Sequence, residues 1–258
     1  MVPFRGDKIN AQNFTSTRKQ VRSYDYHHYL CLLELPPNIR KAAFALRAFN
    51  VETARAMDVA SDPNIGLMRL LWWQEAIDKI YANKVIEHPT AQALSSVISE
   101  NRISKGWLKR PVEARINDAR REVTDIPETI EELEKYAEDT VSTLLYMTLQ
   151  AGDIKSTAAD HAASHVGKAS GLLCCLDHFH IMLVATDTFV TYQLKWQPNM
   201  GTGSFISWNS PAEARSVLLP AVPAQVFLDT LRQVHFDVFD PRLARGVMGI
   251  SPLWHQLK

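Results

Sequence analysis

Two pairs of side chains, each spaced four residues apart, are of types that bind metal ions. Asp58 and Asp62 are carboxylates, which Mg²⁺ prefers, and His161 and His165 are imidazoles, which suit Zn²⁺. On a helix, residues four apart lie on one face. However, the acidic pair ends at a proline, and Asp160 beside the histidines favours a capping or packing network, with no third ligand evident. We therefore expect solvated acids at a helix end and a structural histidine pair; a displaced metal site at the acidic pair is the alternative.

The three cysteines show no metal-binding or disulfide pattern. Cys31, Cys174 and Cys175 are odd in number and lack C-x-x-C spacing, and the two adjacent residues cannot easily bridge each other. A structural zinc site would need further thiols or imidazoles. The cysteines therefore indicate a reducing compartment in which the thiols are free and mostly buried.

Two other groups of residues could contact ligands or partners. Trp72 and Trp73 could line a pocket for an apolar ligand or a partner surface, although an aromatic pair in the core or at its rim is the simpler expectation. An acidic run fits the first turn of a helix, where it complements the helix dipole and needs no function. Its members are Glu128, Glu131, Glu132 and Glu134.

The first 22 residues are rich in cations. Asp7 is the acid among them, and hydroxyl side chains lie between the cations, which are Arg5, Lys8, Arg18, Lys19 and Arg22. This balance is typical of a mitochondrial presequence and also suits contact with anionic lipid, but the segment lacks a clear apolar face. We predict a flexible or targeting arm over residues 1–22.

Length and charge limit the classes of protein that this chain can belong to. Its 258 residues suffice for one domain with a proper core. The 28 lysines and arginines balance 28 aspartates and glutamates, so no overall field attracts nucleic acid. No window approaches the ~20 apolar residues of a membrane-spanning helix. The composition therefore favours a globular protein without a nucleic-acid partner.

Apolar residues recur at spacings of three and four over most of the chain, which predicts helices. The predicted helices cover residues 25–33, 37–62, 65–80, 90–100, 104–121, 127–152 and 158–176. The sequence Ser210-Pro211-Ala212-Glu213 is typical of a capping box that opens another helix, and a last helix follows Pro223 and ends near Asp240. These patterns predict an all-α fold.

Residues 178–210 interrupt this pattern. They are rich in β-branched and aromatic side chains, have no helical period, and contain the loop-forming residues Pro198, Gly201 and Gly203. We hypothesise that this segment comes from an alternative exon or a faulty gene model. The predicted organisation is one helical domain over residues 23–258, interrupted by this atypical segment.

Two segments resemble conserved parts of the squalene and phytoene synthases. The run from Leu35 to Phe49 contains the L-P-P, the basic cluster and the aromatic-A-L-x-A-F pattern that open those enzymes. The segment from Ala162 to Ala169 resembles the helix that carries their second catalytic motif. The resemblance implies a single helical bundle of the isoprenoid synthase type.

The first metal-binding motif of that family is degenerate in this sequence. The enzymes bind Mg²⁺ through D-D-x-x-D on one helix, because an allylic diphosphate ionises only when cations neutralise the leaving group. In the family's register these positions hold Ala54, Arg55 and Asp58. Alanine cannot bind a metal, and arginine places a permanent positive charge where the cation should lie. Glu52 comes two residues too early to replace them.

The second motif is degenerate as well. Where the family has an Asn-x-x-Arg-Asp pattern, this sequence places Cys174, Asp177 and His178, and its one carboxylate stands a position early. The resemblance therefore implies a pseudoenzyme without catalytic, cofactor-binding or metal-binding residues. An active Mg²⁺-dependent prenyl transferase and a non-catalytic isoprenoid-binding protein are the alternatives.

Several further blocks resemble a non-catalytic branch of the family, whose members assist the assembly of respiratory complex I in mitochondria. In chain order they are residues 24–31, 44–50, 65–69, 134–138, 160–165 and 236–239. This resemblance implies protein contacts with an early complex I assembly intermediate or its subunits. It also implies a location on the matrix side of the mitochondrial inner membrane, with loose attachment to that membrane and no cofactor.

Overall fold

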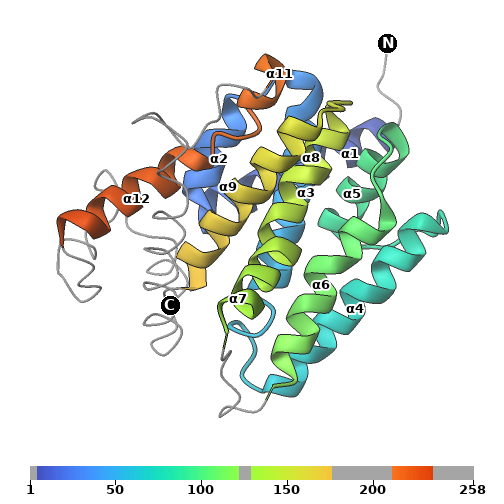
Figure 1. Ribbon diagram of the computed structural model, residues 1–258. Coiled ribbons are helices and arrows are strands. Elements are labelled where there is room, and N and C mark those ends of the chain that lie inside the picture. Colours follow the sequence, from blue (N-terminus) through green and yellow to red (C-terminus); the bar gives the residue numbers. More distant parts are fainter. Residues whose placement is uncertain (1–4, 122–128, 176–210, 235–258) are drawn as a thin grey trace.

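The computed structural model describes residues 5–121, 129–175 and 211–234, and every regular element in these ranges is a helix (Figure 1). The predicted all-α fold is thereby confirmed. In chain order the helices are α1 (Arg5–Tyr24), α2 (Tyr26–Leu33), α3 (Pro37–Ala54), α4 (Pro63–Tyr81), α5 (Pro89–Glu100), α6 (Lys105–Ala119), α7 (Ile130–Ala137), the π-helix η1 (Glu138–Ser142), α8 (Thr143–Ala151), α9 (Thr157–Cys175), α11 (Ala212–Arg215) and α12 (Ala221–Gln233).

The helix starts follow from local chemistry. A proline occupies the first helical turn of α3, α4 and α5, where its missing N–H costs no hydrogen bond. Thr129 caps α7 by accepting a hydrogen bond from the backbone N–H of Glu132. A capping box was predicted from Ser210 to Glu213. In the structure Pro211 is the N-terminal cap of α11, and no side-chain hydrogen bond caps this helix. Ser210 lies outside the described residues.

The core is built around α3, which contacts α1, α2, α4, α5, α6 and α8. In Figure 1, α4, α5 and α6 lie on one side of the bundle, and α9, α11 and α12 lie on the other. The main cluster joins α3 to α4, α5, α6 and α8 through large buried side chains, which include Leu46, Phe49, Leu70, Ile77, Leu94, Leu108 and Met147. A second cluster joins α3 and α8 to α9 and α11 through Ile39, Leu149, Ala163, Val166 and Ala214.

The long helix predicted over residues 127–152 contains a π-helical turn. The five residues of η1 separate α7 from α8, and the turn lies where α9 packs closely against it. A Cβ atom added to Gly167 of α9 would overlap Ser142, and one added to Gly171 would stand 2.6 Å from the Cβ of Ala137. Two glycines on one face of α9 thus allow the two backbones to approach each other directly.

The basic segment at the start of the chain is helical from residue 5, where we had predicted a flexible or targeting arm. Helix α1 packs on α3 and α5, and Val21 and Thr17 are completely buried in that contact. Asn13, Phe14, Thr17 and Val21 recur at spacings of three and four, so they form a mixed polar and apolar face that a search for apolar residues alone misses. A targeting role of these residues stays a prediction.

The atypical segment 178–210 lies outside the described residues. Within the described ranges, no helix is long and apolar enough to cross a membrane.

Candidate functional site

The residues predicted to replace the first motif lie at the end of α3 and in the turn after it. Ala54 is the last residue of this helix and is exposed, and Asp58 is exposed in the turn that follows. Arg55 caps the helix, and its guanidinium group stacks on the ring of Tyr24 at 3.6 Å from the ring centroid. The cation–π contact with α1 therefore fixes a positive charge at the position predicted, from the resemblance, to correspond to the second aspartate of the motif.

Glu52, the nearest carboxylate upstream, takes part in a separate network. It accepts hydrogen bonds from Thr90 at 2.5 Å and Gln20 at 3.0 Å, and its second oxygen lies 3.5 Å from Nε2 of His88. These contacts tie α3 to α1 and to the start of α5. Glu52 thus serves to join helices, and its oxygens already have hydrogen-bond donors.

Asp58 and Asp62 lie in the segment between α3 and α4. Asp62 is the N-terminal cap of α4 and accepts hydrogen bonds from both the backbone and the side-chain nitrogen of Asn64, at 2.8 and 3.1 Å. This geometry confirms the expectation of helix-end acids, since capping satisfies an N–H that the helix itself leaves free.

The second motif falls at the end of α9. Cys174 belongs to the last turn of that helix, while Asp177 and His178 lie outside the described residues. The preceding part of α9 carries the glycines that contact η1 and α7, so the resemblance noted from Ala162 to Ala169 corresponds to a tightly packed helix surface.

A buried arginine of α6 forms hydrogen bonds with α3. Arg115 of α6 is only 8% exposed, and it donates hydrogen bonds to Thr53 at 2.8 Å and to Asn50 at 2.7 Å. Tyr136 of α7 is a further hydrogen-bond partner, and burial lowers the pKa of Arg115. Our sequence analysis missed this residue, although its spacing from Leu108 and Val112 places it on the buried face of α6.

These side chains do not fit the Mg²⁺ ions that active family members need. Ala54 offers no donor atom, Arg55 carries the wrong charge, and Asp58 is a single exposed carboxylate. Within the described residues, no three His, Cys, Asp or Glu side chains are placed to hold a metal ion.

A polar cluster joins α2 to α3. Arg47 pairs with Asp25, and the Nδ1 atom of His28 lies 2.7 Å from Asp25 and 2.6 Å from Arg47. Burial alone would raise the pKa of Asp25, but Arg47 and His28 lower it well below its ordinary value. Burial and Arg47 lower the pKa of His28, so the ring is neutral at pH 7. The cluster therefore holds the Asp25 carboxylate ionised inside the protein.

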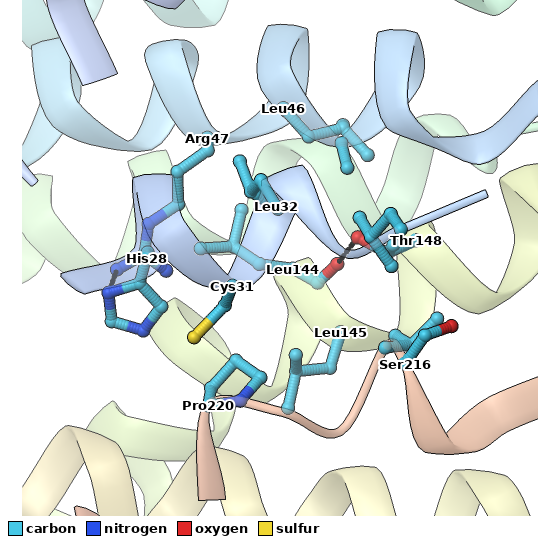
Figure 2. A pocket seen from close by; sticks show the side chains of 13 residues that line it. His28, Cys31, Leu32, Leu46, Arg47, Leu144, Leu145, Thr148, Ser216 and Pro220 are labelled. Carbon is cyan, nitrogen blue, oxygen red and sulfur yellow. Dashed lines mark hydrogen bonds between the residues drawn. The ribbon is translucent and has the colours of Figure 1, made fainter. Parts of the chain in front are cut away.

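A small cavity of about 30 Å³ lies beside this cluster, between α2, α3, α8 and the segment around α11 (Figure 2). Figure 2 shows His28 and Arg47 at one end and Thr148 and Ser216 at the other. Its volume is enough for about one water molecule and far too small for an isoprenoid chain. Cys31 lines it as a free thiol, whose pKa burial raises to about 11. Cys31 is thus free and partly buried, where we expected free and mostly buried thiols, and its raised pKa disfavours the reactive thiolate.

The other candidate residues from the sequence contact neighbouring side chains or lie at the start of a helix. His161 and His165 face each other on α9, with 3.3 Å between their Nε2 atoms. Trp73 is buried against Phe49, whereas Trp72 is 38% exposed, so the tryptophan pair lies at the rim of the core as expected. Glu131 and Glu132 occupy the first turn of α7; Glu128 lies outside the described residues.

Comparisons with known proteins place these features in a family. The family model described as squalene/phytoene synthase matches residues 21–179. A bovine protein named NADH dehydrogenase (ubiquinone) complex I, assembly factor 6, is 35% identical over 254 residues, which is 87% of this chain and 75% of the relative. A Drosophila melanogaster homologue of the same name is 42% identical over 162 residues, which is 60% of this chain and 47% of the relative.

Two solved structures share the fold. A squalene synthase from Alicyclobacillus acidocaldarius superposes with a TM-score of 0.67 at 16% identity, over 89% of this chain and 97% of the enzyme. A dehydrosqualene synthase superposes with a TM-score of 0.63 at 15% identity, over 96% of this chain and 95% of the enzyme. At these identities the likeness concerns the helical fold alone.

Proposed function

The chain belongs to the squalene/phytoene synthase family, and from this premise we propose that it is a non-catalytic assembly factor for mitochondrial complex I. It acts through protein–protein contacts with an early assembly intermediate of complex I or its subunits. The relatives that share about a third of its residues over most of their length carry the name of a complex I assembly factor.

The observation that carries the non-catalytic part of this proposal is the position of Arg55. Its guanidinium group, held on Tyr24, places a positive charge where the family's enzymes have an acidic metal ligand. Ala54 replaces the first of the three aspartates, and only the third remains, as Asp58. We propose that Ala54, Arg55 and Asp58 are the remnants of the first motif, and that Cys174, Asp177 and His178 are those of the second.

We further propose that the protein works on the matrix side of the inner membrane, attached to it peripherally. The names of the relatives support a mitochondrial setting, because complex I is the respiratory NADH:ubiquinone oxidoreductase.

Gene disruption followed by blue-native electrophoresis of all respiratory complexes tests the assembly function. We expect complex I to be lost while the other complexes are kept, and the intact gene to restore it. Normal complex I in the disrupted cells, or an equal loss of every complex, would contradict the proposal.

A second experiment tests the absence of catalysis. Purified protein is incubated with Mg²⁺ and a long-chain allylic diphosphate, and pyrophosphate is measured. We expect no release above the level without protein. Pyrophosphate release would show an active prenyl transferase, and thermal stabilisation by the diphosphate without release would show an isoprenoid-binding protein.

A further inference from the structure

The first half of α4 presents apolar side chains to solvent. Ile65, Met68 and Trp72 recur at spacings of three and four, and Leu71 lies beside them. Met68 is 67% exposed, and the other three are about 40% exposed. A helix on the surface of a bundle normally turns polar residues outward, so this exposed apolar stripe calls for an explanation.

The stripe forms one wall of a groove of about 590 Å³, which we call the α4 groove. Trp73 closes the bottom, where its ring packs on Phe49 and against His88, and α1 and α3 supply the opposite wall. Its apolar lining consists mainly of Val51, Val59, Ile65, Met68, Trp72 and Trp73. An apolar lining of this kind suits an inserted row of side chains from another molecule.

Two guanidinium groups line the α4 groove among these apolar residues. Arg69 is exposed on α4, and Arg55 lies on the opposite wall, where its Nε atom is buried and has no hydrogen-bond partner among the described residues. Glu52, the acid of the groove, is held by Gln20, Thr90 and His88. The guanidinium groups of Arg55 and Arg69 therefore give the groove positive charge, whose complement is a carboxylate.

We infer that the α4 groove docks an amphipathic helix of a partner protein, whose apolar side chains fill the groove and whose acidic side chain pairs with Arg55 and Arg69. This inference rests on the proposed function, because it names the surface through which the assembly factor acts. Met68 suits such a surface, since its flexible thioether adapts to the shape of the partner.

The charges next to the groove favour a protein partner over a lipid surface. Asp58 precedes Val59 in the sequence and Asp62 follows it, just before α4, and both aspartates are exposed. Their negative charges would repel the anionic headgroups that attract basic protein surfaces to membranes. The hollow shape of the groove also differs from the protruding apolar face that enters a lipid interface.

Photo-crosslinking in cells tests the inference. The full chain carries a photoreactive phenylalanine analogue at Met68, and a second chain carries it at Val85, which is 88% exposed and outside the groove. We expect the Met68 position to crosslink to a subunit or assembly factor of complex I, and the Val85 position to give at least tenfold less of that product. Crosslinks from Met68 to lipid, to a second copy or to proteins unrelated to complex I would overturn the inference.

Substitutions separate this inference from the proposed function. Trp72→Ala, Met68→Glu and Arg69→Glu are each expected to lower the association with the complex I intermediate by about tenfold or more, since a few central residues dominate such contacts. The matched controls, Val85→Glu and Arg120→Glu, change exposed residues outside the groove and should behave as the unmodified chain does. Circular dichroism and thermal midpoints identify any variant that fails to fold, and such a variant is replaced by Met68→Gln.

The two proposals fail in different ways. If the unmodified chain does not restore complex I in disrupted cells, the proposed function is wrong. If the unmodified chain and all folded groove variants restore complex I equally, the function stands and the docking inference is wrong. Flotation with cardiolipin-containing vesicles adds a third comparison, because binding that Met68→Glu abolishes would make the groove a lipid-binding surface and overturn the inference.

Discussion

Arg115 brings a guanidinium group into the interior of the bundle, and its partners among the described residues are the neutral groups of Asn50, Thr53 and Tyr136. Removing the side chain would leave the Asn50 amide and the Thr53 hydroxyl buried without that donor and would open a cavity. We expect Arg115→Ala to lower the free energy of unfolding by about 3 kcal/mol.

Urea denaturation of the purified protein measures this loss. Arg120→Ala, an exposed arginine at the end of the same helix, is the matched control and should change stability by less than about 0.5 kcal/mol. Equal effects of the two substitutions would mean that the hydrogen bonds of Arg115 contribute nothing to the fold.

The Asp25, His28 and Arg47 cluster makes stability depend on pH. The pKa of His28 is lower in the folded protein than in the unfolded chain, so the unfolded chain binds the proton more readily. The contribution of His28 is therefore present at pH 7 and is lost as the pH falls through about 6.5 toward the lowered pKa. The pKa of Asp25 is lowered too, so its contribution is present above about pH 4 and is lost in stronger acid.

We expect the free energy of unfolding to fall between pH 7.5 and pH 5, with a slope of up to about 1.4 kcal/mol per pH unit for each histidine involved. His27 and His165 also have lowered pKa values, so His28→Gln is compared with the unmodified protein. The variant should have a shallower slope over this range. An unchanged slope would show that His28 does not take up a proton on unfolding.

At the residue scale, the assignment of Ala54, Arg55 and Asp58 to the first motif stays a prediction, because it comes from the family's register and no contact in the structure tests it. The partners of Arg55, Glu52 and Arg115 could not be predicted, since Tyr24, Thr90 and Asn50 come from helices that are distant along the chain.

Among the elements, the contact between α9 and η1 depends on two glycines. The Cβ of an alanine at Gly167 would overlap the backbone of Ser142, which cannot move without disturbing η1. At Gly106, in the first turn of α6, a Cβ would meet only the Oγ of Ser104 at 3.7 Å. Replacement by alanine should therefore lower the stability of the protein at Gly167 and raise it at Gly106.

We expect Gly167→Ala to destabilise the protein by about 2 kcal/mol through overpacking, and Gly106→Ala to stabilise it by up to about 1 kcal/mol through helix propensity. Thermal and urea denaturation of both variants provide the measurement. A neutral or stabilising Gly167→Ala would mean that the helices separate easily, and the close approach of α9 would then be unimportant for the fold.

The helices from α2 to α9 could be predicted from apolar periodicity, and most of their ends from proline and capping residues. The end of α3 was predicted wrongly, because the helix predicted over residues 37–62 ends at Ala54. Residues 25–33 and 90–100, for example, differ from α2 and α5 by one residue at one end. The π-helical turn could not be predicted, because Glu138 to Ser142 keep a helical pattern and the widened turn depends on the packing of α9. Helix α1 was missed because polar Asn13 and Thr17 form much of its buried face.

For the whole molecule, the resemblance to the synthases and the helical pattern predict the same fold, and the structure has it. On the proposed function, a partner protein contacts the surface of this bundle. The α4 groove combines residues of α1, α3 and α4 with His88, which precedes α5, so its shape depends on the correct assembly of the N-terminal half.

Helix α1 is therefore expected to be necessary for the stability of the entire bundle. It contacts α3 and α5, Asn13 donates a hydrogen bond to Gln92 at 2.7 Å, and Phe14 lies under the ammonium group of Lys41. A chain that begins at Asp25 loses these contacts and the burial of Val21. We expect its thermal midpoint to fall by about 10 °C or more, or the protein to aggregate on expression.

Val21→Asp and Arg22→Asp separate this structural role from the basic charge of the segment. The first places a charge in a completely buried position and should reproduce much of the loss, while the second changes an exposed neighbour and should keep the thermal midpoint within a few degrees. If the chain that begins at Asp25 melts at the same temperature as the full chain, α1 is dispensable for the fold. The segment would then be free to act as the arm that its composition suggests, because its removal would cost the bundle nothing.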